Sequence, residues 1–240
     1  MRKLLLSSFI LLALSACDKD KNTEPTSIPN KPTTELYTQL QEASSQGDLE
    51  KVRALIRQGA NVNLLVQDKS KNYEDYYEET PLMLASQKGH LDVVKELLSA
   101  GANVNQILPV EPERCMLPGE NNTALEMAYR PDNMEVVKVL AQAGTNAQSI
   151  VRCACLHNDE QLLQIALQQK PNLDFTYGEG GVSPLTLASE QGYENIVKLL
   201  LEAGADPNYD PDEDGETALK AATAKNHSKI VELLKSYGSK

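Results

Sequence analysis

Hydrophobic residues recur with helical spacing along most of the chain, in pairs of short segments joined by a glycine or a polar turn. In the sequence TPLMLASQKGHLDVVKELLSAGANVN, which begins at Thr80, this spacing predicts two amphipathic helices. Thr80 suits the N-cap of the first helix, and Pro81 suits its first turn, where the missing N–H costs nothing. Gly89 turns the chain, and Gly101 ends the second helix in the manner of a left-handed C-cap. The residues expected to face the core are Leu82, Leu84, Ala85, Val93, Val94, Leu97 and Leu98.

The same helix pair recurs along the chain. SPLTLASEQGYENIVKLLLEAGADPN begins at Ser183 and TALKAATAKNHSKIVELLKSYG begins at Thr217, both in gap-free alignment with the first unit. Further copies begin at Thr38 and Thr123, and a degenerate copy begins at Ser149. One helix pair cannot bury its own apolar face, so we expect the six copies to stack into a solenoid.

This pattern resembles the ankyrin repeat, and the resemblance covers the chain from about Glu35 to Lys240. It implies an all-α solenoid of six helix-pair repeats with β-hairpin fingers, near residues 35–63, 64–105, 106–148, 149–174, 175–208 and 209–240. The copies start 42, 43, 26, 34 and 34 residues apart, against about 33 in ankyrin units. We therefore expect two enlarged fingers and a missing fourth finger, with the inserted segment Gln106–Asn122 covering the site left bare before Ser149.

The N-terminal segment differs from the repeats. Arg2 and Lys3 precede an apolar stretch over 4–14 that is too short for a membrane-spanning helix, which predicts a signal peptide over residues 1–16. The polar, proline-containing segment 17–34 is expected to be a flexible tether before the repeat domain at 35–240.

The end of this signal, Leu14-Ser15-Ala16-Cys17, resembles a bacterial lipobox. The resemblance implies a diacylglyceryl group on the Cys17 thiol and a lipid-anchored protein in the periplasm, because several acyl chains anchor a protein stably. Asp18 resembles the signal that retains enteric lipoproteins in the inner membrane, although an outer-membrane anchor is also compatible with the sequence. Ordinary secretion, with Cys17 as an unmodified cysteine, is the alternative.

The chain is acidic. Its 23 Lys and Arg against 34 Asp and Glu give a formal charge of −11, which argues against a nucleic-acid partner because phosphate contacts need a basic surface. Without Arg2 and Lys3 the mature chain keeps 21 basic residues and has a charge of −13. The loops before the helix pairs, here called fingers, carry −11 of this charge on 49 of 224 residues. These fingers are Leu64–Glu79, Gln106–Asn122, Phe175–Val182 and Tyr209–Glu216.

The fingers also hold five of the nine tyrosines, which give large rigid contact areas in binding surfaces. Solvated loops are the alternative interpretation. Acidic groups around such anchors would steer a partner with a basic patch. The candidate partner-binding residues of the fingers are Tyr73, Tyr76, Tyr77, Glu78, Glu79, Tyr177, Tyr209, Asp210, Asp212 and Asp214. The ankyrin resemblance adds positions that vary on the concave face, which are Gln87, Lys88, Arg130, Pro131, Glu190 and Gln191.

Three cysteines remain once Cys17 is lipidated. In an oxidising compartment we expect a disulfide from Cys115 in the third finger to Cys155, or less favourably to Cys153, which would pin the insertion across the fourth repeat. The alternative is a metal site, since Cys153, Cys155 and His157 read C-x-C-x-H. On a helix the side chain of Cys155 points away from the other two, which disfavours that site.

Other chemistry finds little support. Asp210, Asp212 and Asp214 open a calcium-loop spacing, but its twelfth position holds Ala221 in place of the bidentate Glu. His90 and His227 share one repeat position, at which ankyrin units commonly carry a structural His. The chain has no serine-hydrolase elbow, HExxH motif or phosphate loop. We therefore expect no catalytic residue, no cofactor, no metal and no small-molecule substrate.

These features predict a non-catalytic, protein-binding lipoprotein of the periplasm. One hypothesis is an immunity protein that neutralises an antibacterial toxin, and the other is a scaffold or stress-related helper of a resident envelope protein. An enzymatic or metal-binding protein is the least favoured alternative, because fold alone does not name a function.

Overall fold

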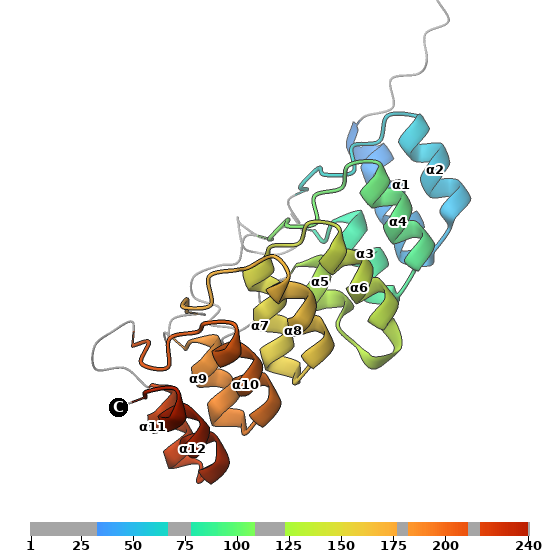
Figure 1. Cartoon of the computed structure of the whole chain (residues 1–240). Helices are drawn as coiled ribbons and strands as arrows, with labels where there is room; N and C mark the ends of the chain where they lie inside the picture. The colour runs from blue at the N-terminus through green and yellow to red at the C-terminus, as the bar shows by residue number, and fades with distance from the viewer. Residues whose placement is uncertain (1–32, 67–77, 109–122, 177–181, 211–216, 240) are drawn as a thin grey trace, which may run out of the picture. The chain divides into compact units, whose positions relative to one another are not determined.

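The computed structural model describes residues 33–66, 78–108, 123–176, 182–210 and 217–239, and these residues form six consecutive helix pairs without a β-strand (Figure 1). The first helices of the pairs are α1 (Thr33–Gln46), α3 (Pro81–Lys88), α5 (Ala124–Ala128), α7 (Ala147–His157), α9 (Pro184–Gln191) and α11 (Ala218–Ala224). The second helices are α2 (Leu49–Arg57), α4 (Leu91–Ser99), α6 (Met134–Gln142), α8 (Glu160–Leu167), α10 (Glu194–Glu202) and α12 (Ser228–Ser236). A 3₁₀ turn, η1 (Pro131–Asn133), lies between α5 and α6.

The helices form two layers. Second helices pack against second helices at every junction between adjacent pairs, and first helices pack against first helices at every junction except the one between α5 and α7, where contact is slight. Close approach in the first layer depends on one small residue at the same position of every repeat, and all six copies of it are fully buried. These residues are Ala43, Ala85, Ala128, Ala154, Ala188 and Ala222. The predicted all-α solenoid of six helix pairs is confirmed.

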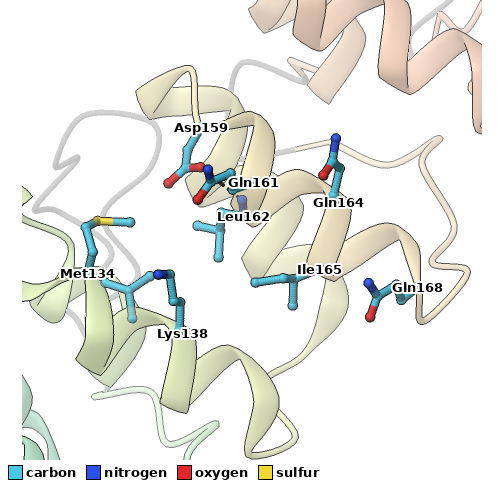
Figure 2. A pocket seen from close by; sticks show the side chains of 9 residues that line it. Met134, Lys138, Asp159, Gln161, Leu162, Gln164, Ile165 and Gln168 are labelled. Carbon is cyan, nitrogen blue, oxygen red and sulfur yellow. Dashed lines mark hydrogen bonds between the residues drawn. The ribbon is translucent and has the colours of Figure 1, made fainter.

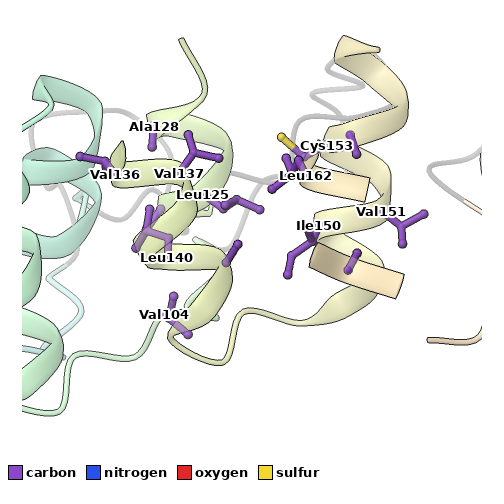
Figure 3. Close-up of a cluster of buried hydrophobic side chains, with 14 of the residues drawn as sticks. Val104, Leu125, Ala128, Val136, Val137, Leu140, Ile150, Val151, Cys153 and Leu162 are labelled. Carbon is purple, nitrogen blue, oxygen red and sulfur yellow. The ribbon is translucent and has the colours of Figure 1, made fainter. Parts of the chain in front are cut away.

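The core runs through all the pairs as one cluster. Around the third and fourth repeats it contains Leu125, Leu140, Ile150 and Leu162, which come from α5, α6, α7 and α8 (Figure 3). In the second repeat the structure confirms most of the expected core. Leu84 and Leu98 are only half-buried, whereas the buried members are Leu82, Ala85, Val93, Val94 and Leu97.

Helix ends follow the predicted capping chemistry. The Thr80 hydroxyl accepts the N–H of Met83 at 3.3 Å, and Pro81 occupies the first turn of α3. Gly89 has a left-handed φ of 76° at the C-cap of the same helix. The matching hydroxyls of Ser183 and Thr217 cap α9 and α11 in the same way.

Two helices begin earlier than the repeat register suggested. Helix α1 starts at Thr33, so Thr38 lies inside it and donates its hydroxyl to the carbonyl oxygen of Thr34 at 3.0 Å. Helix α7 starts at Ala147, so Ser149 also lies inside a helix. The cause at α7 is the missing finger: the chain passes directly from α6 to Asn146, whose side chain accepts the Gln148 N–H at 2.8 Å and caps α7.

The inter-helix turns bind neighbouring repeats together. The ring nitrogen Nε2 of His90 donates to the carbonyl oxygen of Ser45 at 3.0 Å, and His227 donates equivalently to Glu190 at 3.0 Å. The structural role expected for both histidines is therefore confirmed. In the third repeat Asn133 replaces the histidine, and its Nδ2 donates to the carbonyl oxygen of Ser86 at 3.3 Å.

A second set of inter-repeat bonds runs along the other end of the helix pairs. Asn63 Nδ2 donates to the Gly101 carbonyl oxygen at 2.8 Å, and Asn63 Oδ1 accepts the N–H of Asn103 at 2.7 Å. Asn105 makes the same two bonds to the next repeat, to Gly144 at 2.9 Å and Asn146 at 2.7 Å. We call this set the loop ladder. It ties the second helix of one repeat to that of the next.

Within the residues described, no helix is long and apolar enough to cross a membrane. The expected signal peptide, tether and lipidation site at Cys17 lie outside the described residues, as do the tips of all four fingers.

Candidate functional site

The candidate residues at the inter-helix turns lie at the ends of the first helices. Lys88 and Gln191 are the last residues of α3 and α9, and both are exposed. Gln87 and Glu190 precede them and are half-buried. The turn therefore presents two adjacent polar side chains from each of these repeats.

The third repeat presents its turn differently because α5 stops early. Arg130 is extended, with φ −152° and ψ 151°, since the residue before a proline is pushed out of the helical region. Pro131 then opens η1, and both residues are exposed. The Arg130 guanidinium pairs with Asp132 at 3.3 Å on the surface, where such a pair contributes little stability.

The charges along these turns are mixed. Lys88 and Arg130 are basic, whereas Glu190 pairs with Lys225 of the next repeat at 3.2 Å. The described turns therefore do not carry the strong negative charge of the fingers. A partner that covers both regions would meet two different surfaces.

The base of the first finger is held by backbone bonds. The N–H of Glu78 donates to the carbonyl oxygen of Val66 at 2.8 Å, and the carbonyl oxygen of Glu79 accepts from Gln41 Nε2 at 2.8 Å. Both glutamates are half-buried. The buried phenol of Tyr37 lies near Glu78, and burial first, then this carboxylate, raises the pKa of Tyr37 above its ordinary range. Glu79 thus attaches the finger to α1, whereas the Glu78 bond closes the base of the finger on itself.

The base of the last finger is also described. Tyr209 and Asp210 are half-buried, and the Tyr209 N–H donates to the carbonyl oxygen of Asp206 at 3.1 Å. Several candidate residues lie outside the described residues, and their binding roles stay predictions. These are Tyr73, Tyr76, Tyr77, Tyr177, Asp212 and Asp214.

The cysteines of α7 are both buried free thiols. Burial raises the pKa of Cys153 to about 12 and also raises the pKa of Cys155. Cys155 carries no disulfide in this structure, so the expected bridge to Cys115 is not formed in it; Cys115 lies outside the described residues. No group of three metal-ligating side chains occurs in the described ranges, where Cys153, Cys155 and His157 do not gather around one point.

His157 instead stacks on Tyr129 of the preceding repeat. The ring centroids are 4.0 Å apart and the planes are 10° from parallel. The Tyr129 hydroxyl donates to Asp159 Oδ2 at 3.0 Å, while Oδ1 of the same carboxylate caps α8 through the Leu162 N–H at 2.9 Å. Burial lowers the pKa of His157, an effect that the Asp159 carboxylate partly offsets. The sequence pattern did not predict this cluster.

A buried ion pair between Glu126 and Arg152 is the second unpredicted contact. Their side chains are 13% and 6% exposed, which is unusual for charged residues. Glu126 also accepts the N–H of Thr123 through Oε2 at 3.4 Å, completing a capping box on α5. A sequence signal existed: the two residues occupy the same repeat position in consecutive copies, where the second repeat has the buried Met83.

A shallow groove of about 160 Å³ lies between α6 and α8 (Figure 2). Its lining includes the apolar side chains of Met134, Leu162 and Ile165 and the charged side chains of Lys138 and Asp159. Pockets for small ligands are larger, roughly 300 Å³ and above. The groove also lacks a nucleophile with an adjacent base, so its geometry gives no support to catalysis.

Curated relatives match only part of the chain. The ankyrin repeat and KH domain-containing protein mask of Drosophila melanogaster is 34% identical over 82 residues, as is the human ankyrin repeat and KH domain-containing protein 1. These matches cover 34% of this chain but only 2% and 3% of the two relatives. The chain therefore spans a small fraction of their length.

Solved structures match most of the chain. The human ASB11 ankyrin repeat domain has a TM-score of 0.57 and 28% identity, over 84% of each chain. A chain from the complex of a predatory endopeptidase of Bdellovibrio bacteriovorus with an immunity protein has a TM-score of 0.58 and 27% identity, over 82% of this chain and 97% of that one.

The family model described as ankyrin repeats (3 copies) matches residues 7–107, 40–150 and 150–240. The last two matches meet at residue 150, inside the degenerate fourth repeat, and together they span helices from all six pairs. The helix pairs, the capped turns and these matches agree, and the chain belongs to the ankyrin repeat family.

Proposed function

We propose that this protein binds another protein and neutralises it, as an immunity protein acting against an antibacterial toxin. Ankyrin repeats are protein-interaction modules, and the proposal rests on one observation beyond that. The chain is similar, over 97% of the other chain's length, to a component of a complex between an endopeptidase and an immunity protein. A secreted hydrolase of the cell envelope is the partner class that this likeness favours.

The surface supports a protein partner. Lys88, Arg130 and Gln191 are exposed at the inter-helix turns of the second, third and fifth repeats. The fingers add tyrosines and a net charge of −11. Such acidity would accelerate association with a basic partner, and its effect would decline with ionic strength because salt screens exposed charges.

We further propose that the protein acts in the periplasm from a lipid anchor on Cys17, with Asp18 favouring the inner membrane. The support is the sequence Leu14-Ser15-Ala16-Cys17 after a short apolar stretch. A Cys17→Ala variant should lose acyl labelling and leave the membrane fraction. Continued membrane association of that variant, at the level of the unchanged protein, would remove the proposal.

Binding is tested by immobilising the full chain, capturing partners from envelope extracts and measuring the affinity of the purified partner. Replacing Tyr73, Tyr76 and Tyr77 together by Ala should weaken binding at least about tenfold if the first finger supplies the contact anchors. The control is Tyr237→Ala, which removes a tyrosine that is 43% exposed at the end of α12. Unchanged affinity of the triple variant would move the site to the inter-helix turns or the last finger.

Immunity is tested in the producing cell. Deleting the gene should cause self-intoxication that disappears when a neighbouring toxin gene is also deleted. A deletion strain that grows normally in the presence of that toxin would favour the scaffold role instead. Metal-dependent turnover that is lost on His157→Gln would contradict the non-catalytic assignment.

A further inference from the structure

We propose that the junction between the third and fourth repeats is a hinge, at which the first-helix layer opens while the second-helix layer stays packed. The inference concerns the free chain and does not depend on the proposed function. The junction is the contact region between α5 and α6 on one side and α7 and α8 on the other.

The packing of the two layers differs at this junction. At the neighbouring junctions α3 packs extensively on α5 and α7 packs less extensively on α9, but α5 and α7 make only marginal contact. The second layer is continuous, because α6 packs on α8 as α4 packs on α6 and α8 on α10. A layer that is continuous on one side and interrupted on the other bends about the continuous side.

The sequence of the third repeat departs from the other repeats at this junction. Helix α5 has five residues, whereas α3 and α9 have eight, because Arg130 and Pro131 end it early. At about 1.5 Å per residue the shorter helix offers less than two turns of surface to α7. Helix α5 still packs on α3 as extensively as α1 does, so the missing contact lies on its α7 side.

The loop ladder is interrupted at the same place. Asn63 and Asn105 join the earlier repeats, and Asp174 continues the series by accepting the Asp206 N–H at 2.9 Å. The corresponding position at this junction is Gln148, which lies inside α7 because the fourth finger is missing. In the described part of the chain, Gln148 makes no side-chain bond to the loop that follows α8.

The fourth repeat also has non-glycine residues at two backbone positions where most of the other repeats have glycine. Asn158 has φ 56° and Lys170 has φ 50°, a left-handed region that costs non-glycine residues free energy. Three other repeats have glycine at the position of Asn158, namely Gly47, Gly89 and Gly192. All five other repeats have glycine at the position of Lys170, namely Gly59, Gly101, Gly144, Gly204 and Gly238. Local opening is therefore easier in this repeat than in its neighbours.

Two side-chain contacts hold the first layer closed. One is the Tyr129 cluster, in which the phenol bonds Asp159 and stacks on His157. The other is the buried pair of Glu126 and Arg152, which joins α5 to α7 directly. Both contacts cross the junction between side chains alone, so when they break, α7 loses its packing on the α5 side and its helical bonds can open locally. They act as the latch of the hinge.

Hydrogen exchange of the full chain, followed by mass spectrometry, tests the hinge. The amides of Val151–Cys155 in α7 should exchange at least about tenfold faster than the amides of the interior of α9. Helix length predicts the opposite order, since α7 has eleven residues and α9 has eight. Equal or slower exchange in α7 would overturn the hinge.

The latch is tested with Tyr129→Phe, which removes only the hydroxyl, and with Arg152→Met, which leaves the buried Glu126 carboxylate without its partner in the ion pair. Both should accelerate exchange in α7 severalfold and leave α9 and α11 unchanged. The matched control is Arg53→Gln, which removes a partly buried ion pair to Glu96 across the first junction, 2.9 Å long. Acceleration that is equal in all helices would show that the solenoid opens as one unit and would overturn the proposal.

Discussion

The hydroxyl of Tyr129 donates a hydrogen bond to Asp159 Oδ2 at 3.0 Å, across the only junction of the described repeats at which a finger is missing. The same carboxylate caps α8. Tyr129 replaces a small buried residue of the other repeats, such as Ser86 or Ser189, and so reaches into the next repeat.

Tyr129→Phe is expected to lower the free energy of unfolding by about 1 kcal/mol, because the bond to Asp159 is lost while the ring keeps its stacking on His157. Urea unfolding followed by circular dichroism measures this change. Tyr237→Phe, at an exposed position, is the control. An unchanged midpoint for Tyr129→Phe would mean that water replaces the bond at no cost.

Gly192→Ala should destabilise the fold more than Gly204→Ala. Both glycines have a left-handed φ, 79° and 97°, so alanine at either position carries a backbone cost of about 1 kcal/mol. An added Cβ at residue 192 would lie 2.7 Å from the His227 ring, whereas nothing lies within 4 Å at residue 204. We expect a loss of about 2–3 kcal/mol for Gly192→Ala in thermal unfolding, from strain added to the backbone cost. Equal losses would contradict the close packing of His227.

Asn105→Ala should cost about 1 kcal/mol, since it removes both loop-ladder bonds to the third repeat at a surface position. Asn105→Asp keeps the acceptor for the Asn146 N–H but loses the donor to the Gly144 carbonyl oxygen, and should cost less. This order is to be checked by urea unfolding. A larger loss for the aspartate would show that carboxylate repulsion dominates at this site.

The thiols of Cys153 and Cys155 should resist alkylation in the folded protein at pH 8, because burial raises the pKa of each and keeps it protonated. Peptide mapping after iodoacetamide treatment, with and without urea, measures the protection. The same digest without reductant tests the predicted disulfide. A peptide linking Cys115 to Cys155 would establish the bridge, and free thiols at all three positions would remove it.

His157 should titrate below its ordinary pKa of 6.5, because burial disfavours the imidazolium more than Asp159 favours it. The folded state then binds the proton less readily than the unfolded state. Its contribution to stability is complete above pH 6.5 and is lost as the pH falls toward the lowered pKa. An NMR titration of the ring should give a midpoint below 6.5, and His157→Gln should reduce the loss of stability on acidification.

Repeat-wide features were predictable because each one occurs several times in the sequence. Thr80, Ser183 and Thr217 share a register with their glycine turns, so the caps and helix pairs followed from local chemistry. The predicted helix starts at Thr38 and Ser149 were wrong, because no finger precedes these two helix pairs to fix where the first helix begins. The contacts of the candidate site were harder to predict from the sequence. Glu126 and Arg152 look like ordinary surface charges in their own repeats, and their pairing is visible only when the two repeats are placed side by side.

The histidine turns have a consequence for how such a chain gains or loses repeats. The carbonyl oxygen of Glu190 belongs to one helix pair, but the donor that satisfies it, His227, belongs to the next. A repeat that is lost takes with it the donor for the repeat before it. The bond is then made again only if the repeat that follows carries a histidine or an asparagine at the same position, as His90, Asn133 and His227 do.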